Sequence, residues 1–240
     1  MKSPTSISLI SLEIRRVSLR PYYLAALICS VTMLAFHYFM AAIPLIDPSE
    51  TDAALFSSYE FLFSLNQLLS LSAFTILGAV MGARFIIEDY SGARAILIFS
   101  YPVSRKKIMG AKLLLVFSYS TAAMLLCGVV TGGLFLLTES LFPLCPDTLT
   151  AGTAAWIMLS LLCHALFTGF LTLISVWFGF RRKSVPVTIV SAVIVASVVC
   201  QVLSAAFAFH PALFLLTGMA AASAVMAVNN LTHSVENMEI

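Results

Sequence analysis

The best candidates for chemistry within the long apolar stretches of this 240-residue sequence are five polar side chains: His37, Asn66, Gln67, His164 and Gln201. An ionised side chain at the centre of a bilayer costs about 2.5–3.5 kcal/mol on insertion scales, so ionisable groups at that depth tend to be functional. His164 can hydrogen-bond to a neighbouring helix, contact a substrate or relay a proton. Asn66 and Gln67 can pack helices together or line a pathway. The five residues are therefore the candidate lining of a substrate pathway.

Motifs that would let the chain catalyse a reaction are absent from the sequence. It has no Gly-x-x-x-x-Gly-Lys-Ser/Thr phosphate loop, no His-Glu-x-x-His pair or Cys/His cluster, and no Gly-x-Ser-x-Gly elbow. We therefore expect no catalytic site, metal or cofactor on this chain. His164 has no predicted nucleophile or carboxylate at its depth, which argues against an intramembrane enzyme. No Asp, Glu, Lys or Arg lies at the centre of an apolar stretch, which argues against an ion-coupled secondary transporter. Both classes remain alternatives.

The elements that must hold these residues follow from the composition, which is 60% hydrophobic and 10% charged. Soluble domains are about 45–50% apolar and about 25% charged. The net charge of +2 gives no reason to expect a nucleic-acid partner. About 20 apolar residues cross a bilayer as a helix, and the unbroken runs favour helices over a barrel. The sequence predicts an all-α integral membrane protein with a single transmembrane domain over residues 1–240. Its predicted spans are 22–46, 61–83, 113–138, 151–178, 187–208 and 211–229.

The charges give this domain an orientation. All 13 Lys and Arg lie before the first span, between the second and third, or between the fourth and fifth. The alternate connections hold only acidic charges: Asp47, Glu50, Asp52, Glu60, Glu139 and Asp147. Basic residues stay on the cytoplasmic side. Both termini are therefore predicted to be cytoplasmic.

Two cytoplasmic segments have patterns of their own. Residues 1–20 place Ile7, Ile10 and Ile14 on one helical face and Arg15 on another, which predicts an interfacial amphipathic helix. The connection 84–112 is the longest. Its Glu88 and Asp89 favour a helix start, Pro102 breaks that helix, and Ser104 can cap a helix that continues into the third span. Small-residue spacings in three spans can serve packing within the chain or self-association: Gly78-x-x-x-Gly82, Gly128-x-x-x-Gly132 and Gly218-x-x-x-Ala222.

The connection 84–112 also carries a family resemblance. It contains Glu88-Asp89-Tyr90-Ser91-Gly92-Ala93-Arg94, then Tyr101-Pro102-Val103-Ser104-Arg105, then Gly110-Ala111-Lys112. These elements resemble the membrane subunits of ABC exporters of the type-2 permease family, and among them small peptide and bacteriocin exporters. Members show an acidic residue and a glycine in this connection, a Pro-Val-Ser-Arg-like element, and a lysine at the base of the third helix. The amphipathic N-terminus and the six spans match the same family.

The resemblance implies partners and a mechanism. In that family this connection forms a coupling helix, here about residues 88–100, that docks on a separate ATPase subunit. The residues implied in docking are Glu88, Asp89, Tyr90, Gly92, Arg94, Pro102, Ser104 and Arg105. ATP and Mg²⁺ would bind to two copies of the ATPase, and a second permease, identical or different, would complete a dimer. The implied location is the bacterial cytoplasmic membrane. The expected cargo is hydrophobic or amphipathic, such as an antimicrobial or toxin-like peptide; alternatively, it is a drug or lipid.

Overall fold

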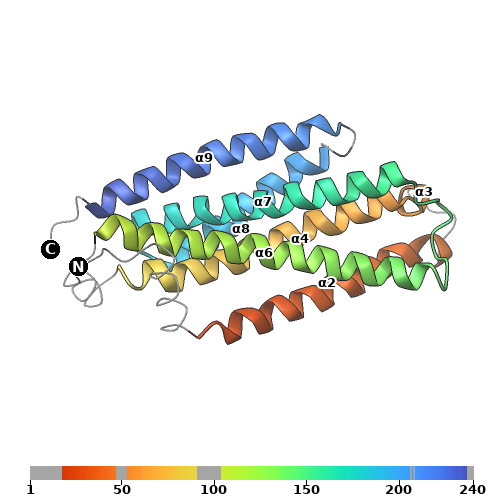
Figure 1. Ribbon diagram of the computed structural model, residues 1–240, viewed down its shortest axis with the longest axis horizontal. Coiled ribbons are helices and arrows are strands. Elements are labelled where there is room, and N and C mark those ends of the chain that lie inside the picture. The colour runs from red at the N-terminus through yellow and green to blue at the C-terminus, as the bar shows by residue number, and fades with distance from the viewer. Residues whose placement is uncertain (1–17, 47–52, 91–103, 206, 208, 237–240) are drawn as a thin grey trace.

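Six long helices pack side by side into an elongated bundle (Figure 1). The computed structural model describes residues 18–46, 53–90, 104–205, 207 and 209–236, and contains no strand among them. The six helices are long and apolar enough to cross a membrane, which confirms the predicted all-α class with six spans. They are α2 (Arg20–Ile46), α4 (Tyr59–Gly82), α6 (Arg105–Glu139), α7 (Ala151–Arg182), α8 (Val185–Ala205) and α9 (Pro211–Glu236). A single turn, α3 (Ala53–Phe56), precedes α4, and a π-helical turn, η1 (Ala83–Ile87), extends it.

The largest boundary difference concerns α6, which begins eight residues before the predicted span at 113. Ser104 occupies its N-cap position, as predicted, although the serine side chain makes no capping hydrogen bond. At 1.5 Å per residue the 35 residues of α6 extend over about 52 Å, whereas the hydrocarbon core is about 30 Å thick. The helix is therefore long enough to project beyond the core. The predicted amphipathic helix over 1–20 falls almost wholly outside the described residues.

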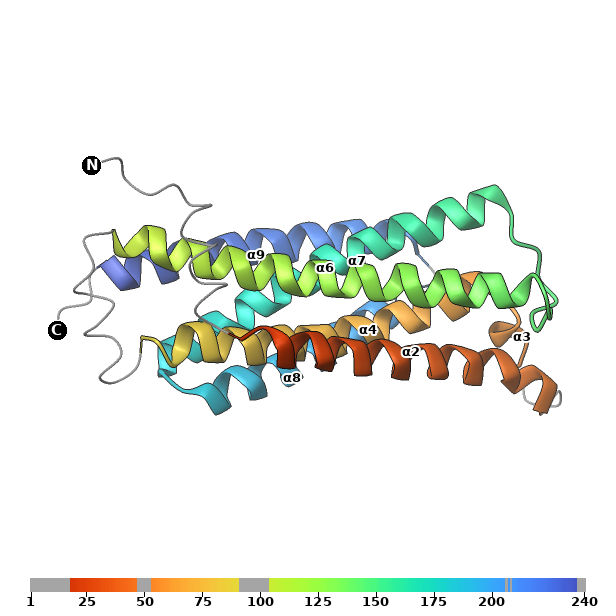
Figure 2. The same ribbon diagram turned by 60° about the horizontal axis from the view of Figure 1, so that its bottom comes forward.

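Successive long helices run in opposite directions along the bundle (Figures 1 and 2). At one end α4 stops, α6 and α8 begin, and α7 and α9 stop. We call this the basic end, because its described helix termini carry Arg84, Arg105–Lys107 and Arg181–Lys183. The opposite end, the acidic end, carries Glu60, Glu139 and Asp147. The predicted separation of charges along the sequence is thus also a separation in space.

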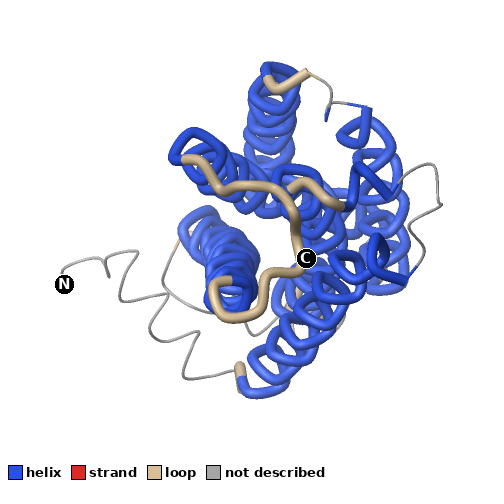
Figure 3. Tube along the Cα trace, turned by 90° about the vertical axis from the view of Figure 1, so that its right-hand side faces the viewer, coloured by secondary structure: helices blue, strands red, loops and turns tan. Residues whose placement is uncertain are grey.

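Helices α4 and α7 form the centre of the bundle. The most apolar stretch of each is 67% buried, whereas that of α2 is 11% buried and those of α8 and α9 are 22% buried. Figure 3 views the bundle from one end and shows the helices side by side, some of them tilted relative to others. Helices with so much exposed apolar surface are suited to a lipid environment. The chain therefore has the architecture of a multi-pass membrane protein.

Small residues let α4 and α7 approach closely. A Cβ atom at Gly78 would lie 2.8 Å from Thr172 Oγ1, and one at Gly82 would lie under 3.0 Å from Val176. Close backbone approach of this kind is what holds helices together in lipid. A Cβ at Gly218 of α9, in contrast, would meet nothing within 4 Å. The first small-residue spacing thus serves packing within the chain, whereas the α9 spacing makes no such contact.

Candidate functional site

At the basic end, α4 widens before it stops. The amide of Glu88 bonds to the carbonyl of Ala83 at 3.1 Å, a π-type spacing of five residues. The turn's apolar side chains, Phe85, Ile86 and Ile87, are buried. Single π turns inside helices frequently occur at functional sites. This turn is therefore a candidate site, and it lies directly before residues 88–100, the segment predicted to dock.

A lysine from the neighbouring helix is bonded to this turn. Lys112 of α6 donates from Nζ to the carbonyl of Phe85 at 2.9 Å and to Oδ2 of Asp89 at 2.5 Å. The lysine is only 2% exposed and Asp89 is 6% exposed. A buried charge needs a paired partner and hydrogen bonds, and each of these groups supplies them to the other. The ion pair therefore ties the end of α4 to the beginning of α6, on either side of residues 91–103.

The other predicted docking residues lie in different environments. Tyr90 is buried, and its ring meets the edge of Phe180 at a centroid distance of 5.8 Å. Glu88 and Arg105 are partly buried, and Ser104 is exposed. The remaining three lie outside the described residues: Gly92, Arg94 and Pro102. Asp89 and Tyr90 thus act inside the bundle, and of the described set Glu88, Ser104 and Arg105 are the ones that present surface.

The prediction that Glu88 and Asp89 begin a helix concerns residues that lie mostly outside the described part of the chain. The structure places Glu88 at the C-terminal cap of η1, with Asp89 and Tyr90 in the turn that follows. The carboxylate of Asp89 pairs with the Lys112 ammonium.

The buried polar pair Asn66 and Gln67 lies in the half of α4 nearer the acidic end. Gln67 donates from Nε2 to the carbonyl of Ile157 at 3.1 Å and accepts at Oε1 from the hydroxyl of Ser160 at 2.8 Å. These two bonds join α4 to α7. Asn66 is 5% exposed, and its Oδ1 has no hydrogen-bond partner. Gln67 therefore packs helices together, while Asn66 retains an unused acceptor.

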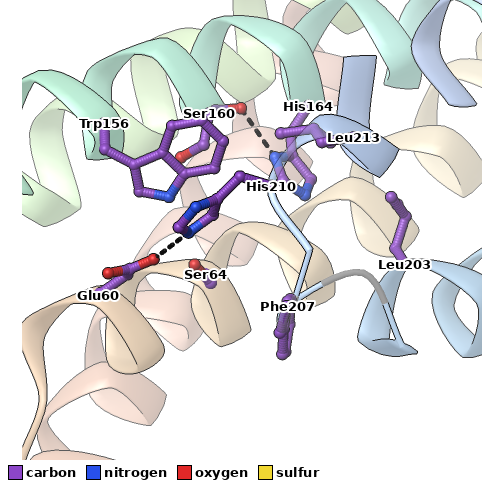
Figure 4. A pocket seen from close by; sticks show the side chains of 9 residues that line it. All are labelled: Glu60, Ser64, Trp156, Ser160, His164, Leu203, Phe207, His210 and Leu213. Atoms are coloured by element: carbon purple, nitrogen blue, oxygen red, sulfur yellow. Dashed lines mark hydrogen bonds and ion pairs between the residues drawn. The ribbon is translucent and has the colours of Figure 1, made fainter. Parts of the chain in front are cut away.

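His164 lies at the wall of a small cavity nearer the acidic end (Figure 4). Its Nδ1 is 2.8 Å from the carbonyl of Ser160 on its own helix, and its buried Nε2 has no partner. Of the roles open to His164, the hydrogen bond to a neighbouring helix is not made in this chain, because the preceding turn of α7 supplies the partner. The cavity has a volume of about 30 Å³, whereas a single water molecule needs about 10–15 Å³. A cavity this small does not accommodate a peptide.

The other two pathway candidates lie away from the Asn66–Gln67 pair and from the cavity beside His164. His37 is 1% exposed between the rings of Phe63 and Phe135, with centroid distances of 4.8 and 4.2 Å. Gln201 is exposed on the surface of α8. The five pathway candidates thus do not converge on one cavity within a single chain.

The sequence analysis missed a side-chain contact at the mouth of the small cavity. His210, which precedes α9, lies with its Nε2 2.5 Å from Oε1 of Glu60 at the start of α4 (Figure 4). The His210 ring also packs against Trp156 of α7, with a centroid distance of 4.2 Å. These residues are far apart in the sequence. The sequence offered one signal: Glu60, Trp156 and His210 all lie at or near predicted span ends on the side with the acidic connections.

Acidic side chains organise the connection that follows α6. Oε1 of Glu139 accepts hydrogen bonds from the amides of Leu144 and Cys145, at 2.7 and 2.6 Å. Asp147 accepts from the amide of Tyr59 at 3.2 Å, at the start of α4. Burial, followed by the nearby charges of Glu139 and Asp147, raises the pKa of the Cys145 thiol to about 11. These carboxylates thus serve as structural acceptors.

Among the described residues, no three His, Cys, Asp or Glu side chains gather in a way that could hold a metal ion.

Comparison with known proteins yields one relative. The chain is 25% identical over 193 residues to a Bacillus subtilis (strain 168) protein described as uncharacterized protein YcbO, covering 80% of this chain and 83% of that protein. No family model matches the sequence. No solved structure matches it either. The chain is therefore similar over most of its length to a protein whose description names no activity.

Proposed function

We propose that this chain is the membrane-spanning permease subunit of an ATP-driven ABC exporter. ATP and Mg²⁺ bind to two copies of a separate ATPase subunit, and a second permease, identical or different, completes the transport unit. The complex resides in the bacterial cytoplasmic membrane with the basic end and both termini in the cytoplasm. The proposal combines the resemblance over residues 88–112 with the arrangement of the helix ends that flank it.

The observation that carries the proposal is the buried Asp89–Lys112 ion pair. Lys112 also bonds to the carbonyl of Phe85, so one lysine of α6 holds two groups at the end of α4, this carbonyl and the carboxylate of Asp89. A force applied to residues 91–103 by a partner would act on both ends of a connection whose helices are already tied together. The movement would therefore be transmitted to α4 and α6 as a unit. α4 is one of the two central helices, which makes it suited to changing the packing of the bundle.

The distribution of charge supports the proposed orientation. In the described chain the connection from α7 to α8 is basic, and so is the first turn of α6. Basic residues are retained on the cytoplasmic side of a membrane, where the ATPase and its nucleotide are found. A purely lipid-binding role of these residues is the competing explanation, because anionic headgroups attract the same charges.

The proposed cargo is a hydrophobic or amphipathic molecule, with toxin-like or antimicrobial peptides preferred and drugs or lipids as the alternative. The support is the apolar character of the spans, whose described charged residues occur towards the ends of the helices. A bundle without central charges is poorly suited to a small hydrophilic ion. The small cavity beside His164 does not fit such a cargo, so the pathway is expected between two permease chains.

The test is assembly with an ABC ATPase subunit; an ATPase reading frame adjacent to the gene for this chain, where the genome has one, is the ATPase to use. The two proteins are co-expressed, the permease is purified, and ATPase recovery and ATP hydrolysis in lipid are measured. We expect Glu88→Arg, or deletion of Gly92, to reduce co-purification and stimulated hydrolysis at least tenfold while the chain still inserts.

Arg182→Glu is the matched control, because it is a charge reversal of equal size on the connection from α7 to α8 at the same end. It should leave assembly intact. If Glu88→Arg assembles and transports like the unaltered protein, the docking assignment is wrong. If Arg182→Glu reduces assembly, Glu88→Arg does not, and added anionic lipid restores assembly, the basic end binds lipid instead.

A further inference from the structure

A second, larger cavity opens between α4, α6 and α7 in the half of the bundle nearer the acidic end. Its volume is about 240 Å³. We call it the lateral groove. Its lining includes Phe63, Asn66 and Gln67 of α4, Val129 and Gly133 of α6, and Met158 of α7. Val129 and Met158 are 46% and 52% exposed, so the groove reaches the outer surface of the bundle. In a membrane, that surface faces lipid.

Three glycines of α6 lie at the groove, and they have different surroundings. A Cβ at Gly128 would collide with Leu161, and one at Gly132 would lie 2.8 Å from the ring of Phe63. A Cβ at Gly133, in contrast, would meet nothing within 4 Å. The first two glycines are therefore used for packing, while the third borders the open part of the groove. A cavity of about 150 Å³ lined by apolar side chains is large enough to bind benzene. The lateral groove exceeds that volume.

The polar groups of the groove are unequally satisfied. Gln67 uses both ends of its amide, on Ile157 and Ser160. Asn66 also lines the groove, and its Oδ1 is buried without a hydrogen-bond partner. A side-chain amide offers two donors and one acceptor, and a buried polar group is costly to leave unbonded away from water. The groove thus combines an apolar surface with one incompletely bonded amide.

We propose that the lateral groove binds an aliphatic molecule bearing one hydroxyl group that enters sideways from the bilayer. The apolar body lies along α6 and α7, and the hydroxyl, which can both donate and accept, bonds to the amide of Asn66. Entry is from the membrane because the exposed lining, Val129 and Met158, is apolar. The site is complete in one chain and does not depend on an ATPase. It therefore stands or fails separately from the exporter function.

The test uses the full chain, purified without any ATPase in lipid nanodiscs. A long-chain alcohol carrying a photoreactive diazirine is added, and labelled peptides are mapped by mass spectrometry. We expect labelling on the groove-lining parts of α6 and α7. Unlabelled decanol should compete about three- to tenfold better than decane, which is the range expected for one net hydrogen bond. Asn66→Leu should make the two competitors equal.

Two glycine variants keep the test independent of the effect of Asn66 on folding. Gly133→Leu places a side chain at the groove and should reduce labelling at least fivefold. Gly110→Leu is the matched control on the same helix, because a Cβ at Gly110 also meets nothing within 4 Å. It should leave labelling unchanged.

Three results would overturn the proposal. The first is labelling that Gly133→Leu leaves intact, and the second is equal competition by decane and decanol in the unaltered chain. The third is absence of label together with crosslinks that show a second copy covering α6 and α7.

Discussion

The ion pair between Asp89 and Lys112 should be one of the strongest single contributions to the basic end. Replacing Lys112 by Met removes the ammonium but leaves the carboxylate of Asp89, which is 6% exposed, without that partner. Breaking a buried ion pair by removing one member costs about 3–5 kcal/mol. In a chain of this size a loss of that magnitude lowers Tm by an amount of the order of 10 °C. Asp89→Asn should be destabilising for the same reason.

The double variant separates pairing from the individual costs. If the two groups stabilise each other, Asp89→Asn combined with Lys112→Met should cost less than the sum of the single changes, by about 2 kcal/mol. The assay is equilibrium unfolding in mixed micelles, followed by circular dichroism. Lys107→Met is the control, because Lys107 is an exposed lysine on the same helix and its loss should change stability by about 0.5 kcal/mol or less.

Two results would refute this reasoning. One is a Lys112→Met variant no less stable than Lys107→Met. The other is a double variant whose loss equals the sum of the single losses, which would mean that the two charges act independently.

Three further outcomes follow from the described contacts. Because its pKa is raised to about 11 from the usual 9.0, Cys145 at pH 8 should have about a hundredfold less thiolate than an ordinary cysteine, and maleimide labelling should be correspondingly slow and rise as the pH approaches 11. Glu139→Gln removes a negative charge beside that thiol, so it should lower the Cys145 pKa and speed labelling, measured by mass shift against time. Gly82→Leu should destabilise the chain by several kcal/mol because a Cβ there collides with Val176, whereas Gly218→Leu, which meets nothing within 4 Å, should be tolerated; comparing their unfolding midpoints checks this pair.

The sequence was a good guide to the spans because their determinants are local. Length and hydropathy are properties of continuous stretches, and a bilayer of fixed thickness imposes the same requirement on each stretch. The start of α6 was displaced because Arg105, Lys106 and Lys107 lower the hydropathy of a helix without preventing it from forming. A hydropathy boundary marks the limit of the apolar part, not the end of the hydrogen-bonded helix. Ser104 was the better signal, because a cap position depends on backbone geometry.

The candidate site was less predictable because its contacts join distant residues. Asp89 and Lys112 are 23 positions apart, and the sequence indicated both as members of one motif without indicating that they pair. His210 and Glu60 are separated by 150 positions. No periodic pattern connects such residues. Only the alternation of charge between successive connections placed each pair at one end of the bundle.

The two polar neighbours on α4 show why residue type alone does not identify a pathway. Asn66 and Gln67 carry the same amide group, and the sequence treats them alike. One extra methylene and a rotation of about 100° around the helix bring Gln67 to Ser160 and the Ile157 carbonyl, where both ends of its amide are used. Asn66 is left with an acceptor beside the lateral groove. A helix contact and a candidate ligand contact therefore lie next to each other in the sequence, and the position of α7 decides which is which.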